Sequence, residues 1–488
     1  MATTDLREQQ LLINGEWRAA GSGDTFSRLD PYTGETATTA SAAGRADAHA
    51  AVDAAHDAFS QWSQTAPGGR RAMLSRAAEL VAERQEEIAQ TMIEETGATF
   101  GWGMFNCMLA GGILREAAAQ TYGTLGAVIP SDVPGKLAMA VRAPAGVVVG
   151  IAPWNAPVIL AARAIAMPLA YGNTVVLKAS ELCPRTHAHV AAAIADAGAP
   201  PGVINFLTNQ PQDAADVVEE LIAHPNTRRV NFTGSTRVGR IIAQLAGRHL
   251  KRTLLELGGK APLIVLADAD LERAAAATSF GAFFHQGQIC MSTERVIVDR
   301  AVAEPFSRLL AARASALRVG DPRDAETQIG PLVNDAARAH VGELVEDARE
   351  HGAEVLAGGV ADGPCYPPTV LFGVNSKMRV YGEESFGPLA SIIPVDGVEH
   401  AIEVANDTEY GLSAAIFSAN VPQALELAQR VQSGICHIND TTVHDEPQMP
   451  FGGVKDSGWG RFGGHAALEE FTELRWITIQ ESERHYPI

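Results

Sequence analysis

The sequence predicts an α/β protein with two successive α/β domains, the first of them a doubly wound parallel sheet. From residue 146 onward, short runs rich in β-branched residues alternate with apolar-periodic helical segments, which is typical of βαβ units. The same rhythm restarts after Gly259. A chain of 488 residues also exceeds what one hydrophobic core usually supports. We therefore expect the two domains to join near residue 258.

The N-terminal part is expected to begin with a hairpin, because Asn14-Gly15 lies between strand-like residues and favours a two-residue turn. Helical patterns follow over 47–62 and 70–96. The first α/β unit then alternates strands with helices. Its expected strands are 146–151, 173–178, 202–207, 228–233 and 253–258, and its expected helices lie near 157–170, 185–197, 213–223 and 237–247.

The second α/β unit repeats this pattern toward the C-terminus. Its expected strands are 261–266, 294–299, 368–372, 389–395, 413–418 and 434–439. The last strand pattern, 474–480, has no local partner. Such a strand either completes a distant sheet or pairs across subunits.

Composition excludes several classes of partner. The net charge of −19, from 38 basic and 57 acidic residues, argues against nucleic acid or an anionic membrane surface. The most apolar stretch, 146–170, is interrupted by Pro153, Pro157, Arg163 and Pro168, so no membrane span is expected.

The cysteines and the N-terminus indicate where the protein works. Five cysteines stand at wide, irregular spacings without a C-x-x-C pair, so neither a disulfide framework nor a metal site is predicted. The N-terminal "MATTDLREQQ" has no apolar core typical of a signal peptide. We expect a cytoplasmic protein.

A glycine-containing turn at the start of an expected helix is a candidate phosphate site. In "FTGSTRVG" a strand ends at Thr233, Gly234-Ser235 form the turn, and Gly239 lies in the first turn of the helix. Free amides at a helix N-terminus bind phosphate, although a plain βα turn would also need glycine. The G-x-G-x-x-G match at 458–463 is rejected because no strand precedes it; we expect a closely packed loop there.

"LKASE" adds Lys178 and Glu181 at the carboxyl end of the second expected strand, where such sheets bind ligands. The carboxylate could accept hydrogen bonds from ribose hydroxyls. It would also repel a 2′-phosphate, which favours NAD over NADP.

Three further residues are candidates for the reaction chemistry, and each has an alternative role. Cys290 follows a Gly-Gln turn and is either a small buried hydrophobe or a nucleophile. Glu256 ends an apolar strand and is either a general base or a ribose-binding acid. Asn155 precedes a helix that opens with Pro157 and is either its cap or a donor to an oxyanion. Together they are the minimum set for covalent chemistry at a carbonyl.

Ordered motifs make the sequence similar to the aldehyde dehydrogenase superfamily. "PWNAP", "FTGSTRVG", "LELGGKAP", "FHQGQIC", "EESFGPL" and "PFGGVKDSG" occur in the family order, and the resemblance covers almost the whole chain. "NAPVILAARAIAMPLA", "IPSDVPG" and "QGQICMSTERVIVD" resemble the bacterial branch that oxidises aromatic aldehydes of the vanillin, salicylaldehyde and benzaldehyde type.

The resemblance implies three structural parts and a homodimer or homotetramer. A Rossmann-like NAD-binding domain would comprise residues 1–120 and 144–257, and a catalytic domain residues 258–448. A small β oligomerisation element would comprise 121–143 and 467–488, which would give the last strand its partner.

The same resemblance assigns roles to individual residues. Cys290 would be the nucleophile, Asn155 the oxyanion donor and Glu256 the base that activates water, so the ribose role passes to Lys178 and Glu181. The thiolate would attack the aldehyde, the thiohemiacetal would lose hydride to NAD, and water would release the acid from a thioester. A cysteine suits this role because it is partly ionised at neutral pH. The remaining cofactor residues would be Trp154, Gly234, Ser235, Gly239, Glu384 and Phe386.

The aldehyde pocket is expected around the helix that follows Asn155. Ala156, Leu160 and Arg163 share one helical face, where Arg163 would meet a ring substituent or pair with a structural acid. Aromatic side chains could complete the walls, although each alone also suits an ordinary core. The candidates are Phe100, Trp102, Phe105, Phe284 and Phe451.

Four alternative functions remain open. An aliphatic or semialdehyde dehydrogenase of the same superfamily differs only in its pocket, and a CoA-acylating enzyme would not need Glu256 to activate water. A cysteine hydrolase without nicotinamide would leave the phosphate turn and "LKASE" without a role. A non-catalytic binding protein would have no reason to retain Cys290, Glu256 and Asn155 together.

Overall fold

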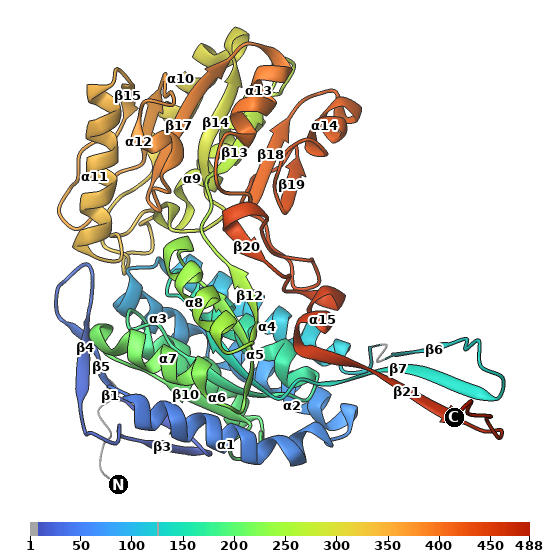
Figure 1. The fold of residues 1–488 in the computed structure, drawn as a ribbon. Helices are drawn as coiled ribbons and strands as arrows, with labels where there is room; N and C mark the ends of the chain where they lie inside the picture. The colour runs from blue at the N-terminus through green and yellow to red at the C-terminus, as the bar shows by residue number, and fades with distance from the viewer. Residues whose placement is uncertain (1–7, 124–125) are drawn as a thin grey trace.

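The computed structural model describes residues 8–123 and 126–488. Two segments lie outside the described residues. They are residues 1–7, which belong to the N-terminal stretch considered for a signal peptide, and residues 124–125, which belong to the expected element 121–143. Figure 1 shows two α/β lobes, one above the other, with a narrow arm projecting from the lower one. None of the described helices combines the length and apolarity needed to cross a bilayer.

The lower lobe is built on an eight-stranded sheet in the order β20-β12-β11-β8-β9-β10-β2-β3. The five expected strands form its parallel centre. The bounds are β2 (Leu11–Ile13), β3 (Glu16–Arg18), β8 (Val147–Ile151), β9 (Thr174–Lys178), β10 (Ile204–Leu207), β11 (Thr227–Thr233), β12 (Arg252–Glu256) and β20 (Gly458–Trp459).

Both faces of this sheet are covered because its strands are apolar on both sides. Val148 packs into the core formed with α2 to α6, whereas Val147 and Val149 pack into the core formed with α1, α7 and α8. The helices are α1 (Arg45–Ser63), α2 (Pro67–Glu83), α3 (Gln85–Thr96), α4 (Phe100–Gln120), α5 (Pro157–Ala170), α6 (Pro184–Asp196), α7 (Ala214–Ala223) and α8 (Thr236–Arg248). The predicted doubly wound sheet is confirmed.

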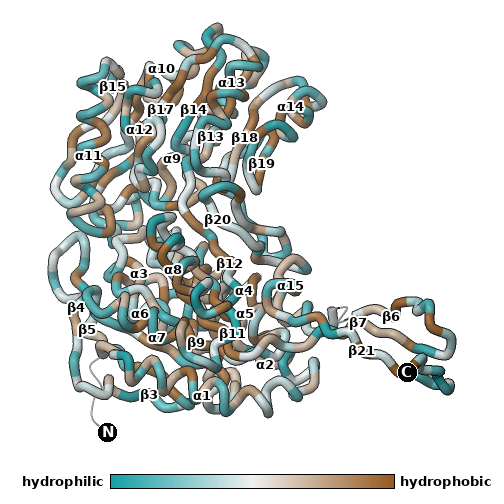
Figure 2. The backbone as a smooth tube through the Cα atoms, in the orientation of Figure 1, coloured by the Kyte–Doolittle hydropathy of each residue, from teal (hydrophilic) through white to brown (hydrophobic). Residues whose placement is uncertain are grey.

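The upper lobe contains a seven-stranded sheet in the order β15-β16-β17-β14-β13-β18-β19. Its strands are β13 (Ala261–Val265), β14 (Thr293–Asp299), β15 (Glu354–Ala357), β16 (Thr369–Phe372), β17 (Leu389–Val395), β18 (Ser413–Phe417) and β19 (Ile435–Ile438). Its helices are α9 (Leu271–Phe283), α10 (Arg300–Ala316), α11 (Asp335–Glu350), α12 (Arg379–Gly382), α13 (Gly397–Asn406) and α14 (Val421–Ala428). Figure 2 shows the hydrophobic residues concentrated on the inner strands of both lobes.

The arm explains the C-terminal strand without a local partner. β21 (Thr472–Gln480) pairs antiparallel with β7 (Lys136–Pro144) along its whole length, and β6 (Gly126–Ile129) pairs with the other edge of β7. The short helix α15 (Ala467–Phe471) leads into β21. The strand therefore completes a distant sheet within the same chain.

Three local features differ from the sequence prediction. The helix expected over 70–96 is two helices, because the backbone at Arg84 (φ −102°, ψ 10°) leaves the helical region. A separate sheet of β1 (Glu8–Gln9), β5 (Thr36–Ser41) and β4 (Thr25–Leu29) was not expected. Gly458, expected in a loop, starts a short antiparallel strand against β12 at a φ of 104°, where a Cβ would meet the Leu255 oxygen at 2.0 Å.

Candidate active site

Two cavities meet at the residues expected to react. One has a volume of about 850 Å³ and the other about 460 Å³, and Asn155 and Cys290 line both. Glu256 lines the smaller cavity. The fold thus brings together three residues that lie on different elements far apart in the sequence.

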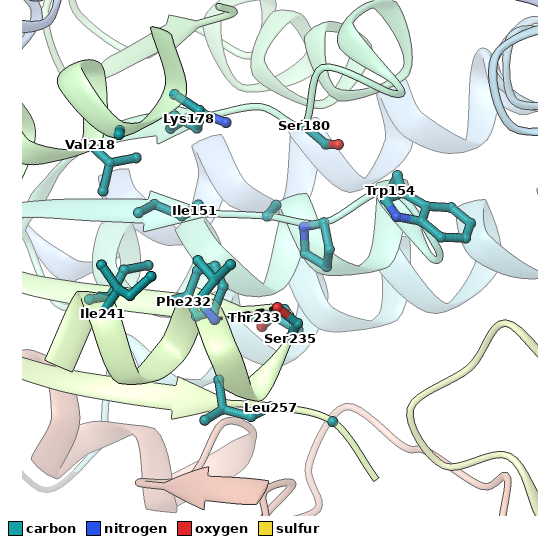
Figure 3. A pocket seen from close by; sticks show the side chains of 18 of the residues that line it. Ile151, Trp154, Lys178, Ser180, Val218, Phe232, Thr233, Ser235, Ile241 and Leu257 are labelled. Carbon is teal, nitrogen blue, oxygen red and sulfur yellow. Dashed lines mark hydrogen bonds between the residues drawn. The ribbon is translucent and has the colours of Figure 1, made fainter. Parts of the chain in front are cut away.

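The larger cavity lies at the carboxyl edge of the lower sheet, where strands β8, β9, β11 and β12 end. Figure 3 shows Lys178, Thr233, Ser235 and Trp154 around this edge, with Val218 and Ile241 facing the same space. Of the residues expected at a cofactor, those that line the cavity are Trp154, Lys178, Glu181, Gly234, Ser235, Glu384 and Phe386. Gly239 lies behind it: a Cβ there would meet Leu257 Cδ2 at 2.4 Å, so its small size allows α8 to pack on the strand end.

The turn into α8 has the geometry of an anion site. Ser235 is the helix N-cap, and its Oγ accepts a hydrogen bond from the Val238 N–H at 3.4 Å. The helix dipole and the free amides of the first turn face the cavity wall formed by Gly234 and Ser235. A Cβ on Gly234 would lie 2.4 Å from Phe232 Cζ, so any larger residue there would have to displace that ring.

An apolar slot extends this cavity between α7 and α8. This slot was not identified from the sequence. The signal that could have found it is the amphipathic pattern of both helices, which leaves an apolar residue such as Ile241 54% exposed. Such a slot suits a flat heterocycle. It is lined by Ala214, Ala215, Val218, Ile241 and Leu245.

Lys178 and Glu181 lie together on one wall of the larger cavity, with 3.9 Å between Lys178 Nζ and Glu181 Oε2. Burial lowers the pKa of Lys178, and the nearby Glu181 carboxylate opposes that shift. The carboxylate itself stays partly exposed, so it can accept hydrogen bonds from a ligand.

Glu384 is held at the inner end of the same cavity. Its Oε1 accepts a hydrogen bond from the Gly259 N–H at 2.7 Å. Burial, together with the nearby Glu294, raises the pKa of Glu384 to about 8. Phe386 lies edge-on to Trp154, with 5.7 Å between the ring centroids.

The loop carrying Glu384 is anchored by a buried acid that the sequence did not single out. Glu294 in β14 accepts hydrogen bonds from the Ser385 N–H and hydroxyl and forms an ion pair with Lys260. Because a buried charge needs such partners, this network fixes the loop relative to Gly259. The only features of the sequence that could have indicated this network were an acid, Glu294, and a lysine, Lys260, at the ends of expected strands.

The segment before the nucleophile has an unusual backbone. His285, Gln286 and Gly287 are consecutive residues with positive φ, at 48°, 56° and 69°. Each non-glycine residue in this region costs on the order of 1–3 kcal/mol. Gln286 offsets that cost through hydrogen bonds from its side-chain amide to the carbonyls of Gly97 and Pro331.

Cys290 is half-buried at the junction of the two cavities. Burial raises its pKa well above the ordinary value, and the charges of Glu256 and Glu384 act in the same direction, while Arg163 opposes them. This direction runs against the partial ionisation at neutral pH that was expected from the sequence. The thiol has to transfer its proton before it can act as a nucleophile.

Glu256 has the properties of a proton acceptor. Burial raises its pKa to about 7, and Asp445 adds to the effect, whereas Arg163 and a hydrogen bond from the Thr233 hydroxyl counter it. Its Oε1 is buried and forms no hydrogen bond within the described chain. A carboxylate whose pKa lies near neutrality and that has a free oxygen is suited to general-base work.

Asn155 does not cap the helix that follows it. The N-cap position of α5 is Ala156, and the Asn155 side-chain amide instead donates to the Gln288 carbonyl at 3.0 Å. The Asn155 carbonyl accepts a hydrogen bond from the Trp102 indole at 3.0 Å. These contacts hold the amide nitrogen beside the loop that carries Cys290.

Arg163 faces acids rather than open space. It forms a close ion pair with Asp445, and its Nη1 lies 3.7 Å from Glu256 Oε1. Its guanidinium also stacks over the Phe451 ring, 4.3 Å from the centroid. Of the two sequence interpretations, the structure supports pairing with an acid; Asp445 could not be found in advance because it lies 282 residues away.

The smaller cavity is walled by aromatic side chains. Trp102 meets Phe284 edge-on at 5.0 Å, and Phe280 stacks on Phe284 at 4.7 Å. Of the residues expected at the pocket, all but Phe100 line it, namely Trp102, Phe105, Ala156, Leu160, Arg163, Phe284 and Phe451. Phe100 is instead 44% exposed at the start of α4. Those that were missed follow no local pattern and include Phe280, Ile289, Val443, His444 and Asp445.

Comparison with known proteins identifies the class of this fold and site. The aldehyde dehydrogenase family model matches residues 17–477. Vanillin dehydrogenase of Pseudomonas fluorescens is 57% identical over 478 residues, which cover 98% of this chain and 99% of that protein. The NAD(+) benzaldehyde dehydrogenase of Pseudomonas putida is 41% identical over 98% of this chain and 97% of its own length.

Solved structures agree. The crystal structure of a salicylaldehyde dehydrogenase from Pseudomonas putida G7, complexed with salicylaldehyde, matches with a TM-score of 0.97 at 43% identity, over 99% of this chain and 100% of that one. The chain belongs to the aldehyde dehydrogenase family. The fold class and the enzyme class predicted from the sequence, an oxidoreductase acting on aldehydes, are confirmed.

Proposed function

We propose that this enzyme oxidises a single-ring aromatic aldehyde to the carboxylic acid, with NAD⁺ as the hydride acceptor. The observation that carries the proposal is the aromatic-walled cavity that meets a larger cavity at Cys290 and Asn155. The relatives named for vanillin, benzaldehyde and salicylaldehyde support the same substrate class. A cysteine hydrolase would leave the larger cavity without a purpose.

The residues of the larger cavity fit NAD. The α8 N-terminus at Gly234 and Ser235 would bind the pyrophosphate, and the slot between α7 and α8 would take the adenine. Lys178 and Glu181 would hold one ribose, and Glu384 the ribose nearest Cys290. Glu181 disfavours a 2′-phosphate through like-charge repulsion, so NAD is preferred over NADP. When bound, NAD⁺ supplies the acceptor for the hydride that leaves the substrate carbon.

The first half of the reaction begins with proton transfer. Glu256, which lies close enough to influence the pKa of Cys290, accepts the thiol proton, directly or through a water molecule. The thiolate sulfur then bonds to the aldehyde carbon. The side-chain amide of Asn155 and the backbone N–H of Cys290 donate to the developing oxyanion. Collapse of this thiohemiacetal expels hydride and leaves a thioester on Cys290.

The second half restores the thiol. Glu256, after releasing its proton to solvent, removes a proton from water, and the hydroxide oxygen bonds to the thioester carbon. The carbon–sulfur bond then breaks, which frees the carboxylic acid, and the proton held by Glu256 returns to the sulfur to restore the Cys290 thiol. A pKa of about 7 suits both proton transfers at neutral pH.

The pocket favours a ring over a flexible chain. Its volume of about 460 Å³ falls within the roughly 300–1,000 Å³ of small-molecule sites. Trp102 and Phe284 can pack on a ring face or edge, while small Ala156 leaves room beside Asn155. An aliphatic aldehyde would make fewer contacts with these aromatic walls.

The test is NADH formation by the purified enzyme with vanillin, salicylaldehyde, benzaldehyde and a short aliphatic aldehyde. We expect a higher kcat/KM for the aromatic substrates and no turnover by the Cys290→Ala variant. A higher kcat/KM for the aliphatic aldehyde would refute the ring preference and leave the family chemistry intact. Binding of NAD without turnover of any aldehyde would refute the activity itself.

We also propose the domain roles expected from the sequence. Residues 1–120 and 144–257 would form the NAD-binding domain and 258–448 the catalytic domain. Residues 121–143 and 467–488 would form an oligomerisation element, a role supported by the exposed apolar side chains of its arm. These are Val128, Ile129, Leu474, Trp476, Ile477 and Ile479. Light scattering should give a dimer or tetramer, and a monomer would exclude this role.

We place the enzyme in the cytoplasm. All five cysteines are free thiols, and an oxidising compartment would expose the nucleophile Cys290 to inactivation. Cell fractionation with a tagged chain tests this placement.

A further inference from the structure

A second cluster of chemistry-bearing side chains lies away from the active site, between α1 and the end of α7. His49 and Asp53 are four residues apart on α1 and therefore share one face of that helix. His224 directly follows the last residue of α7. Figure 1 shows α1 and α7 side by side in the lower lobe. One ligand atom from each of the three residues lies within 4.8 Å of the others.

The spacing of these atoms is close to that of a coordination shell. His224 Nε2 lies 3.3 Å from Asp53 Oδ1, and His49 Nε2 lies 3.4 Å from Asp53 Oδ2. A tetrahedral zinc ion with bonds of about 2.0–2.1 Å has ligand atoms about 3.3–3.4 Å apart. The two distances run to different oxygens of the Asp53 carboxylate, and each matches the separation of two ligand atoms in such a shell. The two rings meet edge-on with centroids 4.4 Å apart.

His224 provides a second, independent observation that favours a bound ligand. Its side chain is buried, with 2% exposed, and its Nε2 has no hydrogen-bond partner in the described chain. The approach of Asp53 Oδ1 therefore lacks the geometry of a hydrogen bond. A buried ring nitrogen left without a partner is costly, and this residue offers a ligand atom within 4.8 Å of those of His49 and Asp53.

The surroundings orient the exposed histidine for coordination. His49 Nδ1 lies 2.9 Å from Glu220 Oε1. The Nδ1–H can therefore donate a hydrogen bond to this carboxylate, which leaves the Nε2 lone pair free to bind an ion. Carboxylate–histidine–metal arrangements of this type are common in protein metal sites. Arg45 pairs with Asp216, Glu219 and Glu220 and offsets part of the local negative charge.

Two contacts would reduce the affinity. His224 Nδ1 accepts a hydrogen bond from the Asn226 N–H at 3.2 Å, and this bond is lost when Nε2 binds an ion and Nδ1 carries the ring proton. The Lys251 ammonium donates to the His224 carbonyl at 3.2 Å and adds a positive charge. The site is therefore suited to moderate affinity.

We propose that His49, Asp53 and His224 form a binding site for a divalent ion of the zinc class, with water completing the shell. Two imidazoles and one carboxylate are ligands that such ions prefer over magnesium or calcium. The sequence predicted no metal because the ligands lie on segments more than 170 residues apart. The ion would fasten α7, whose Val218 lines the larger cavity, to α1.

The test is zinc titration of chelator-treated, tag-free protein carrying Cys290→Ser, so that the nucleophilic thiol cannot bind the ion. Calorimetry and elemental analysis should give one ion per chain, and zinc should raise the melting temperature. His49→Gln and Asp53→Asn should each weaken binding at least tenfold and reduce the thermal shift. Both side chains are about half exposed, so these variants are expected to fold.

His56→Gln is the matched control, because His56 is an exposed histidine on the same helix. It should bind zinc like its parent. Cobalt in place of zinc should give visible bands without the ultraviolet charge-transfer band of a thiolate ligand. Equal binding by the His49→Gln variant, equal loss in the His56→Gln control, or a thiolate signature would each overturn the proposal, whatever the aldehyde activity.

Discussion

Replacing Arg163 with methionine should move the pH dependence of the reaction toward alkaline pH. Arg163 Nη1 lies 3.7 Å from Glu256 Oε1 and lowers the pKa of that carboxyl, which burial and Asp445 raise to about 7. Without the guanidinium, the carboxylate form loses its nearest positive charge. The pKa of Glu256 should therefore rise, and the acid limb of kcat should follow it because the carboxylate is the active form.

The size of the shift follows from the distance. A unit charge at 3.7 Å contributes about 4.5 kcal/mol at an effective dielectric constant of roughly 20, or about 3 pKa units. Water that fills the space left by the guanidinium screens the remaining charges and reduces the net effect to about 1–2 units. At pH 7.5 a rise from about 7 to about 8.5 lowers the carboxylate fraction roughly eightfold.

The assay is a profile of kcat against pH for the wild type and for Arg163→Met, Arg163→Lys and Arg163→Met/Asp445→Asn. Arg163→Lys keeps the charge and should shift the acid limb least. Breaking a buried ion pair costs about 3–5 kcal/mol of stability, so the double variant, which removes both partners, checks the pH effect in a better-folded protein. An unshifted acid limb in the folded variants would refute the electrostatic role of Arg163.

Three further changes test the other parts of the site. Glu256→Gln should lower kcat by about 10²–10⁴-fold, because thiol deprotonation and water activation both lose their proton acceptor, and rapid-quench kinetics should show slower NADH formation in the first turnover; unchanged steady-state turnover would exclude Glu256 as the base. Asn155→Ala should lower kcat/KM by about 10²–10³-fold with little change in NAD affinity measured by fluorescence, and a loss confined to NAD binding would contradict an oxyanion role. Glu181→Gln should raise kcat/KM with NADP at least roughly tenfold relative to NAD, whereas an unchanged ratio would show that the selectivity comes from elsewhere.

The fold could largely be predicted from the sequence because strands covered on both faces produce continuous β-branched runs such as 146–151. β4 and β5 escaped prediction because their polar, threonine-rich residues carry no such run. The break at Arg84 escaped because neither glycine nor proline marks it, and the helical periodicity continues across it. Pairing between β21 and β7 depends on contacts more than 300 residues apart, which no local pattern encodes.

The site could be predicted where chemistry depends on a local motif. Cys290, Asn155 and the α8 turn each stand in a recognisable stretch, and the structure brings them together around two cavities. Asp445 could not be predicted, since only the folded chain brings it to Arg163. The direction of the thiol pKa shift could not be predicted for the same reason, because burial depends on surroundings that a cysteine's sequence neighbours do not reveal.

The separation of the two cavities governs how molecules enter and leave during turnover. Hydride departs on the cofactor side, but Glu256 and the aromatic walls belong to the aldehyde side, so the hydrolytic water must share the smaller cavity with the acyl group. A bulkier ring leaves less space for that water and makes deacylation the slower half of the cycle. The carboxylic acid occupies the smaller cavity until it leaves, and the next aldehyde needs the same space. Product inhibition by the acid should therefore compete with the aldehyde and not with NAD.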